Sequence, residues 1–174
     1  MSDPSTALAV VGVVVVLTAM LMLVKCATTI RPYEVGIVTI FGSYRGLLNP
    51  GLAFVHPLAQ VQRVDLRVQA LEIPSIEAAS RDGHPIRVAA TVSFKVVEAP
   101  KAIFEVQDYR ASIAMASHAA LRSVFGQAQM ADIPSQLSRL NALVREQLAA
   151  AAQGWGISIE AVEIRWTGST LNSP

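Results

Sequence analysis

Cysteine, charge and aromatic side chains are all scarce in this chain of 174 residues, and each shortage removes a class of function. The single cysteine, Cys26, cannot form an intramolecular disulfide. Charged residues make up 16% of the sequence, and the formal net charge is only +1. No stripe of basic residues alternates with aromatic ones, so the composition gives no support for nucleic-acid binding. The low charge also argues against an active site built from several ionised groups.

Catalytic motifs are missing as well. His56, His84 and His118 are far apart and do not have the spacing of a zinc-binding HExxH motif. Ser117 precedes His118, but adjacent residues of a helix point apart, and the sequence has no GxSxG motif. We therefore expect no enzymatic activity, no metal site and no cofactor. A membrane-bound hydrolase that uses Ser117 or a histidine is the less favoured alternative.

Apolar residues are abundant, at 52% of the chain, and they concentrate in the uncharged stretch Ala7–Val24. A helix of that length spans about 27 Å, close to the ~30 Å hydrocarbon core of a bilayer. We expect a short tail at residues 1–6 and a transmembrane anchor at residues 7–27, in which Lys25 reaches the interface. The apolar residues expected to face lipid are Leu8, Val11, Val15, Leu17, Met20, Leu21 and Leu23. A cleaved signal peptide, which needs a basic N-terminal region, and a buried core helix are the alternatives.

The charges that flank this stretch predict its orientation. Lys25 and Arg31 follow it, whereas no basic residue precedes it. The positive-inside rule then places the N-terminus outside and the following domain in the cytoplasm. Cys26 would lie at the membrane boundary, where cysteines can be S-palmitoylated. An unmodified thiol is the alternative.

Residues 28–168 place strands first and helices second, which predicts an α+β domain. Glu34–Phe41 has apolar residues on both faces, Phe41 among them, as in a central strand that is covered on both sides. Ile86–Val97 alternates apolar and polar residues and predicts a half-buried antiparallel strand, paired through an Asp82-Gly83 turn with Ile76–Ser80. Helices are expected at Tyr109–Phe125 and Pro134–Gln153, and a last strand at Ile157–Ile164.

A short linker is expected at Thr28–Pro32, and a loop rich in glycine and proline at Gly42–Gly51. We hypothesise that side chains around this loop enter the membrane interface while Arg45 meets lipid head groups. The apolar side chains of this surface would be Leu47, Leu48, Leu52 and Phe54. The alternative is that Leu52 and Phe54 belong to the core of the sheet.

Five short segments, in the same order, resemble motifs of the SPFH superfamily, which includes stomatin, prohibitin, flotillin and the HflK/HflC proteins. Stomatin-like members are the most similar. The segments are Asn49–Pro57 (NPGLAFVHP), Arg63–Arg67 (RVDLR), Arg81–Gly83 before the strand Ile86–Val97, Leu121–Gly126 (LRSVFG), and Trp155–Ile157 before Val162–Ile164.

The resemblance implies an SPFH domain, a curved antiparallel sheet flanked by helices that lies against the bilayer. It also implies a non-enzymatic scaffold that self-associates laterally, organises membrane patches and takes part in protein quality control. The regulatory alternative is a partner that restrains a membrane AAA protease, an NfeD-type protein or a channel. Relatives continue into a long coiled coil after the last strand, whereas this sequence ends at Pro174. We expect a frayed C-terminus at residues 169–174, in either a natural short form or a fragment.

Overall fold

The computed structural model describes residues 12–18, 20 and 27–169. Residues 12–18 and 20 are helical. Within the described ranges, no helix combines the length and the apolarity needed to cross a membrane. The predicted anchor lies largely outside these ranges and stays a prediction. The residues of that prediction that lie outside the described part are Leu8, Val11, Leu21, Leu23, Lys25 and Cys26.

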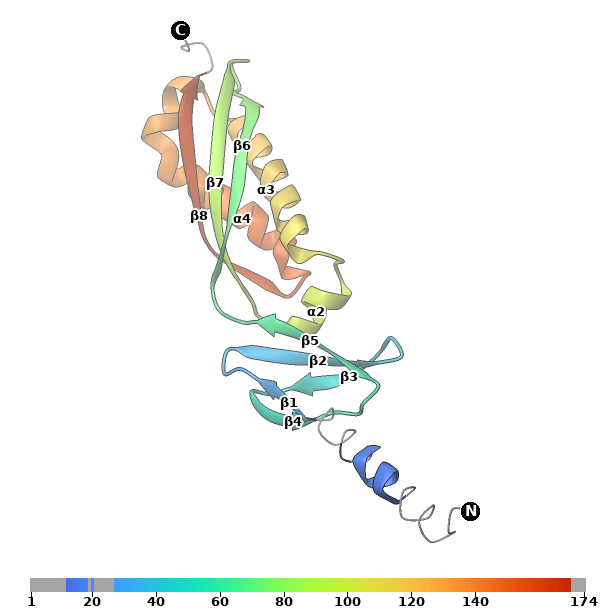
Figure 1. The fold of residues 1–174 in the computed structure, drawn as a ribbon. Coiled ribbons are helices and arrows are strands. Elements are labelled where there is room, and N and C mark those ends of the chain that lie inside the picture. The colour runs from blue at the N-terminus through green and yellow to red at the C-terminus, as the bar shows by residue number, and fades with distance from the viewer. Residues whose placement is uncertain (1–11, 19, 21–26, 170–174) are drawn as a thin grey trace. The chain divides into compact units, whose positions relative to one another are not determined.

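The chain divides after Asp65 into two compact units, and each is described by itself. The first unit contains two small antiparallel sheets (Figure 1). In one sheet, β2 (Glu34–Ile40) lies between β3 (Ser43–Leu48) and β5 (Ala59–Asp65). In the other, β1 (Ala27–Ile30) pairs with β4 (Gly51–Phe54).

The core of the first unit forms where β1 and β5 approach the middle of β2. Ile30, Ile37 and Val64 are almost completely buried there. Gly36 permits the close approach, because a Cβ atom at this position would lie 3.0 Å from both Ile30 Cδ1 and Val61 Cγ1. A larger residue would require these two side chains to shift by a few tenths of an ångström.

Two expectations for this unit were wrong. Thr28–Pro32 is not simply a linker, because Ala27–Ile30 forms β1. Gly42–Gly51 is not a loop, because Ser43–Leu48 forms β3. The pairing of β3 with β2 shifts between Val38 and Thr39, so that Arg45 is the extra residue of a β-bulge beside Gly46. Glycine inside a strand often marks such a bulge, and here its presence concealed the strand.

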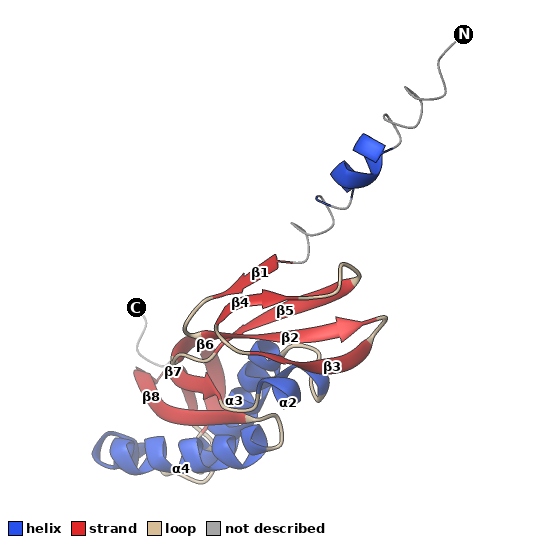
Figure 2. Ribbon diagram, turned by 90° about the horizontal axis from the view of Figure 1, so that it is seen from below, coloured by secondary structure: helices blue, strands red, loops and turns tan. Residues whose placement is uncertain are grey.

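The second unit is a three-stranded antiparallel sheet in the order β6-β7-β8, with α3 and α4 packed against one face (Figures 1 and 2). Its elements are β6 (Gln69–Ala79), β7 (Pro85–Val96), α2 (Ala99–Phe104), α3 (Tyr109–Phe125), the short 3-10 helix η1 (Met130–Asp132), α4 (Ile133–Gln153) and β8 (Ile157–Ser169). The central strand, β7, buries alternate side chains from Ile86 to Val96. The α+β class and the half-buried strand are therefore confirmed.

Local sequence signals account for further details of the second unit. The hairpin between β6 and β7 forms as expected, with a register shift between Ile73 and Ile76 at Pro74. The Asp108 carboxylate accepts hydrogen bonds from the backbone N–H groups of Arg110 (2.9 Å) and Ala111 (3.2 Å), and so caps α3. β8 extends beyond the expected Ile164 as far as Ser169.

Candidate functional site

Large apolar side chains of the first unit point into solvent. The exposed fractions are 86% for Phe41, 73% for Phe54, 66% for Leu52 and 60% for Leu58. We refer to these four side chains as the apolar cluster. Single exposed apolar residues are common on soluble proteins, but contiguous apolar patches mark interaction or membrane surfaces.

The strand register places two members of the apolar cluster, Phe41 and Leu58, at one end of the larger sheet. Ile40 pairs with Ala59, so Phe41 and Leu58 lie next to that pair at the same end of the ladder. Figures 1 and 2 show the β2–β3 turn and the β4–β5 connection at this end. Leu52 and Phe54 are two residues apart on β4, and side chains with that spacing share one side of a strand.

One member of the apolar cluster, Phe54, lies beside the start of β1, which follows the apolar N-terminal stretch in the sequence. Phe54 pairs with Ala27 in the β1–β4 ladder. Ala27 follows the uncharged stretch Ala7–Val24 by only three positions in the sequence. Phe54 is therefore paired with the part of the unit that directly follows the most apolar part of the sequence.

Phe41 is unusual in its backbone as well as in its exposure. Its φ angle is 50°, and that of Gly42 is 79°. These two residues close the β2–β3 hairpin with the positive φ angles of a type I′ turn, which normally selects Asn-Gly. The left-handed conformation costs an L-residue roughly 1–2 kcal/mol. Among the described residues, Phe41 alone adopts a positive φ without being glycine. Such a strained and exposed residue is a candidate functional residue.

The residues of the interfacial surface predicted from the sequence differ in their exposure and in their position on the sheets. Leu52 and Phe54 are mostly exposed, so the alternative that they form sheet core is wrong. Leu47 and Leu48 pair with Ile37 and Gly36, away from the Phe41 turn, and Leu48 is only partly exposed. Arg45 is exposed at the bulge of β3.

Sequence reasoning missed Phe41 and Leu58. Phe41 was assigned to a buried strand face because it continues the apolar pattern of β2. The Phe-Gly pair between two apolar runs was the available signal, since two-residue hairpin turns end in glycine.

The residues considered for catalysis do not come together. Ser117 is fully buried, and its hydroxyl donates a 2.7 Å hydrogen bond to the Ile113 carbonyl one helical turn earlier. His56 Nδ1 accepts a 3.3 Å hydrogen bond from the Leu58 N–H, whereas His118 lies on α3. Within the described residues, no three His, Cys, Asp or Glu side chains are placed to hold a metal ion.

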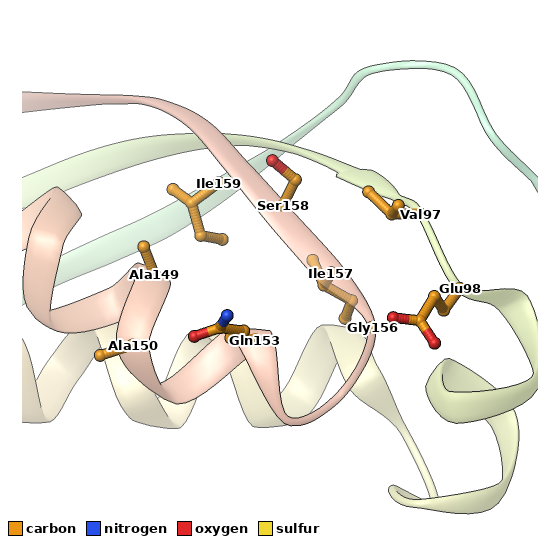
Figure 3. Close-up of a pocket in the computed structure, with 9 residues that line it drawn as sticks. All are labelled: Val97, Glu98, Ala149, Ala150, Gln153, Gly156, Ile157, Ser158 and Ile159. Carbon is orange, nitrogen blue, oxygen red and sulfur yellow. The ribbon is translucent and has the colours of Figure 1, made fainter.

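A cavity of about 380 Å³ lies where β7 ends and β8 begins, beside the last turns of α4 (Figure 3). Its wall includes Val97, Ala149 and Ile157. The one ionisable group among the nine residues drawn, Glu98, forms a 2.9 Å ion pair with Lys101. The Ser158 hydroxyl donates a 3.1 Å hydrogen bond to Glu160 Oε1. Glu160 does not belong to the lining of the cavity, and its carboxylate is paired with Lys95 at 2.9 Å.

An exposed ion pair lies next to this cavity. Lys95 Nζ is 2.9 Å from Glu160 Oε1. The hydrogen bond from Lys95, with a smaller contribution from Ser158, holds the pKa of Glu160 below its ordinary value of 4.5. Because the ion pair is exposed, this shift reports local pairing and not a site prepared for catalysis.

Comparison with known proteins identifies the family. Residues 28–167 match the SPFH domain / Band 7 family. Stomatin homologs from Pyrococcus abyssi and Pyrococcus horikoshii are each 33% identical to the chain, over 89% and 87% of it respectively and over 58% of their own length. Stomatin-4 from Caenorhabditis elegans is 26% identical over 87% of the chain and 55% of its own length. The chain thus spans less than two thirds of the length of these relatives. It belongs to the SPFH domain / Band 7 family, among stomatin-like proteins.

Proposed function

We propose that this protein is a non-enzymatic, membrane-associated scaffold and that its apolar cluster rests in the bilayer interface. The observation that carries the proposal is the position of the cluster. The first unit exposes four large apolar side chains, and one of them, Phe54, pairs with Ala27, which follows the uncharged stretch Ala7–Val24 in the sequence. A membrane surface would cover both features at once.

The size of the apolar cluster suits a supporting contact better than a sole attachment. Complete burial of a large apolar side chain contributes roughly 1.5–3 kcal/mol. Scaled by their exposed fractions, the four side chains would together contribute about 4–8 kcal/mol. A single myristoyl chain binds membranes with a similar, reversible strength of about 10⁴ M⁻¹. The cluster would therefore orient the unit on the bilayer, while the N-terminal stretch supplies the stable attachment.

Lateral self-association is the second part of the proposal. Attachment to a membrane confines the chains to two dimensions, where weak contacts gain effective concentration. In the proposed orientation, the domain faces the cytoplasm. Crosslinking in native membranes followed by mass spectrometry tests this part. Crosslinks mainly between copies of the chain support a scaffold. Crosslinks mainly to a membrane protease, an NfeD-type protein or a channel favour a regulatory role instead.

Vesicle flotation tests the membrane contact. A chain that begins at Ala27 is mixed with vesicles of phosphatidylcholine and phosphatidylglycerol, and the bound fraction is measured. We expect Phe54→Asp with Leu58→Asp to reduce binding at least tenfold. Leu47→Asp with Leu48→Asp should have a smaller effect, because these residues pair away from the Phe41 turn.

Met115→Asp serves as the matched control, because Met115 is an exposed apolar residue of α3 in the second unit. It should leave flotation unchanged. If the variant of Phe54 and Leu58 floats as well as the unmodified chain, the apolar cluster does not contact lipid.

A further inference from the structure

A polar groove runs along α4 and the segment that joins α3 to α4 in the second unit. It consists of two adjoining cavities of about 230 Å³ and 220 Å³. Both cavities are lined by Gln127, Ala128, Gln136 and Leu140, so they form one continuous depression. We refer to it as the α3–α4 groove. It shares no residue with the apolar cluster.

Backbone hydrogen bonds fix the shape of the α3–α4 groove. The Arg81 N–H donates to the Ala128 carbonyl at 2.9 Å, and the Met130 N–H donates to Asp82 Oδ2 at 3.2 Å. These bonds attach the β6–β7 turn to the segment between α3 and α4. The groove therefore lies between the β6–β7 turn, which these bonds fix in place, and α4. Leu140 in its lining is buried.

The two basic residues of the groove lack the ion-pair partners that some other basic residues of this unit have. Lys95 pairs with Glu160 at 2.9 Å, and Arg87 pairs with Glu77 at 3.1 Å. Within the described part of the chain, the side chains of Arg81 and Arg139 have no carboxylate within 4.0 Å and no hydrogen bond. Arg81 lines one cavity and Arg139 the other.

Glutamine amides account for much of the remaining polar surface. Gln127 and Gln136 line both cavities, Gln129 lines the first and Gln147 the second. Their amide groups make no hydrogen bond to other described side chains or backbone groups. An amide side chain offers both donors and an acceptor, the same set that an extended peptide backbone presents.

We propose that the α3–α4 groove binds an extended peptide segment of a partner protein that carries acidic side chains. The glutamine amides would pair with the peptide backbone. Arg81 and Arg139 would each form a charge-assisted, forked pair with a carboxylate. Asp132, which lines the first cavity, would repel an additional acidic residue and so limit where the acidic residues can lie. Two cations among several neutral amides suit a peptide better than a nucleic acid, whose binding depends on many phosphate contacts.

Fluorescence anisotropy with the full chain in mild detergent tests the inference. The probe is a labelled eight-residue peptide of alternating glutamate and threonine, and its counterpart replaces glutamate with lysine. We expect the glutamate peptide to bind and the lysine peptide not to bind. Arg81→Glu combined with Arg139→Glu should weaken binding at least tenfold, whereas Asp132→Asn should strengthen it two- to fivefold.

Arg122→Glu is the control. Arg122 is exposed on the last turn of α3 and does not line either cavity. The affinity of this variant for the glutamate peptide should stay within twofold of the affinity of the unmodified chain. Arg81→Gln with Arg139→Gln, which keeps hydrogen-bonding side chains, should lose most of the affinity while its circular-dichroism melting curve is unchanged.

Three results would overturn the inference. The first is the absence of binding by the glutamate peptide at millimolar concentration. The second is an equal loss of affinity in Arg122→Glu and in the variant of Arg81 and Arg139, which would indicate diffuse charge attraction. The third is equal binding of a thymidine oligonucleotide or of phosphatidylglycerol micelles at the same residues, because the groove would then bind anions of any class.

Discussion

Substitution of Phe41 by asparagine should make the first unit more stable and its membrane contact weaker. Phe41 holds φ at 50° in a turn that it shares with Gly42. An L-residue pays roughly 1–2 kcal/mol for this conformation, and asparagine pays less because its short amide hydrogen-bonds locally. The aromatic ring offsets little of that cost by packing, because 86% of the residue is exposed. We expect the variant to gain about 1 kcal/mol in the free energy of opening of the first unit.

The same substitution removes an aromatic ring that would be buried in lipid in the proposed membrane contact. Complete burial of phenylalanine contributes roughly 1.5–3 kcal/mol, so the exposed part of Phe41 would contribute about 2 kcal/mol in a membrane. A loss of that size corresponds to a roughly 30-fold weaker partition coefficient. Stability and binding should therefore change in opposite directions at this one residue.

Two measurements follow the two effects separately. Hydrogen exchange at the amides of Ile37 and Val38, in the middle of β2, reports opening of the first unit. Exchange there should slow about fivefold in the variant. Vesicle flotation reports the partition coefficient. Phe41→Trp is the control, because it keeps both the strained turn and a large aromatic ring, and we expect it to leave exchange unchanged and flotation intact.

Faster exchange in Phe41→Asn would refute this reasoning, because it would mean that the ring packs on the unit and supports it. Slower exchange with unchanged flotation would have a different meaning. The turn would then be strained as described, but the strain would have no connection with a membrane.

The remaining predictions concern the second unit. Asp108→Ala removes the carboxylate that caps α3 and should lower the free energy of unfolding by about 1 kcal/mol in urea titrations; unchanged stability would mean that water replaces the cap without loss. Gly156→Ala should destabilise by roughly 2–4 kcal/mol, because its Cβ would lie 2.6 Å from the Glu98 carbonyl oxygen at a φ of 68°; a small loss would show that β8 can shift. Lys95→Met should raise the pKa of Glu160 towards 4.5 in a carboxyl NMR titration. Since pairing lowers that pKa in the folded chain, its stabilising effect should be present above pH 4.5 and should disappear as the pH falls through the lowered value.

The sequence predicted the second unit well because one face of its sheet is buried. Burial of a single face forces strict alternation along β7, and that alternation is visible from Ile86 to Val96. Pro74 and the Asp108 cap are local features whose effects depend on a few neighbouring residues. The groove between α3 and α4 could not be predicted in this way, because it depends on the β6–β7 turn meeting a segment about fifty positions later in the chain.

The first unit was harder to predict because its strands are short and its sheets are small. β1 and β4 have four residues each, too few for an alternating pattern to stand out. Gly46 and the bulge at Arg45 broke the pattern of β3, which therefore resembled a loop. The exposure of Leu52 and Phe54 was one of two alternatives left open by the sequence, since an apolar residue in a strand can also belong to the core.

Phe41 shows that the burial of a position depends on the strand pairing as well as on the apolar pattern of the sequence. Along β2 the apolar residues continue without a break into Phe41, and any periodic reading places it inside the sheet. The pairing of Ile40 with both Ser43 and Ala59 ends the strand one residue earlier and turns the ring outward. Phe41 therefore fits the apolar pattern of the strand, but it is exposed where the pattern implies burial. It also has a positive φ angle, which a phenylalanine rarely adopts. Local rules conflict with the fold most often at functional sites, and among the described residues Phe41 is where two of them conflict at once.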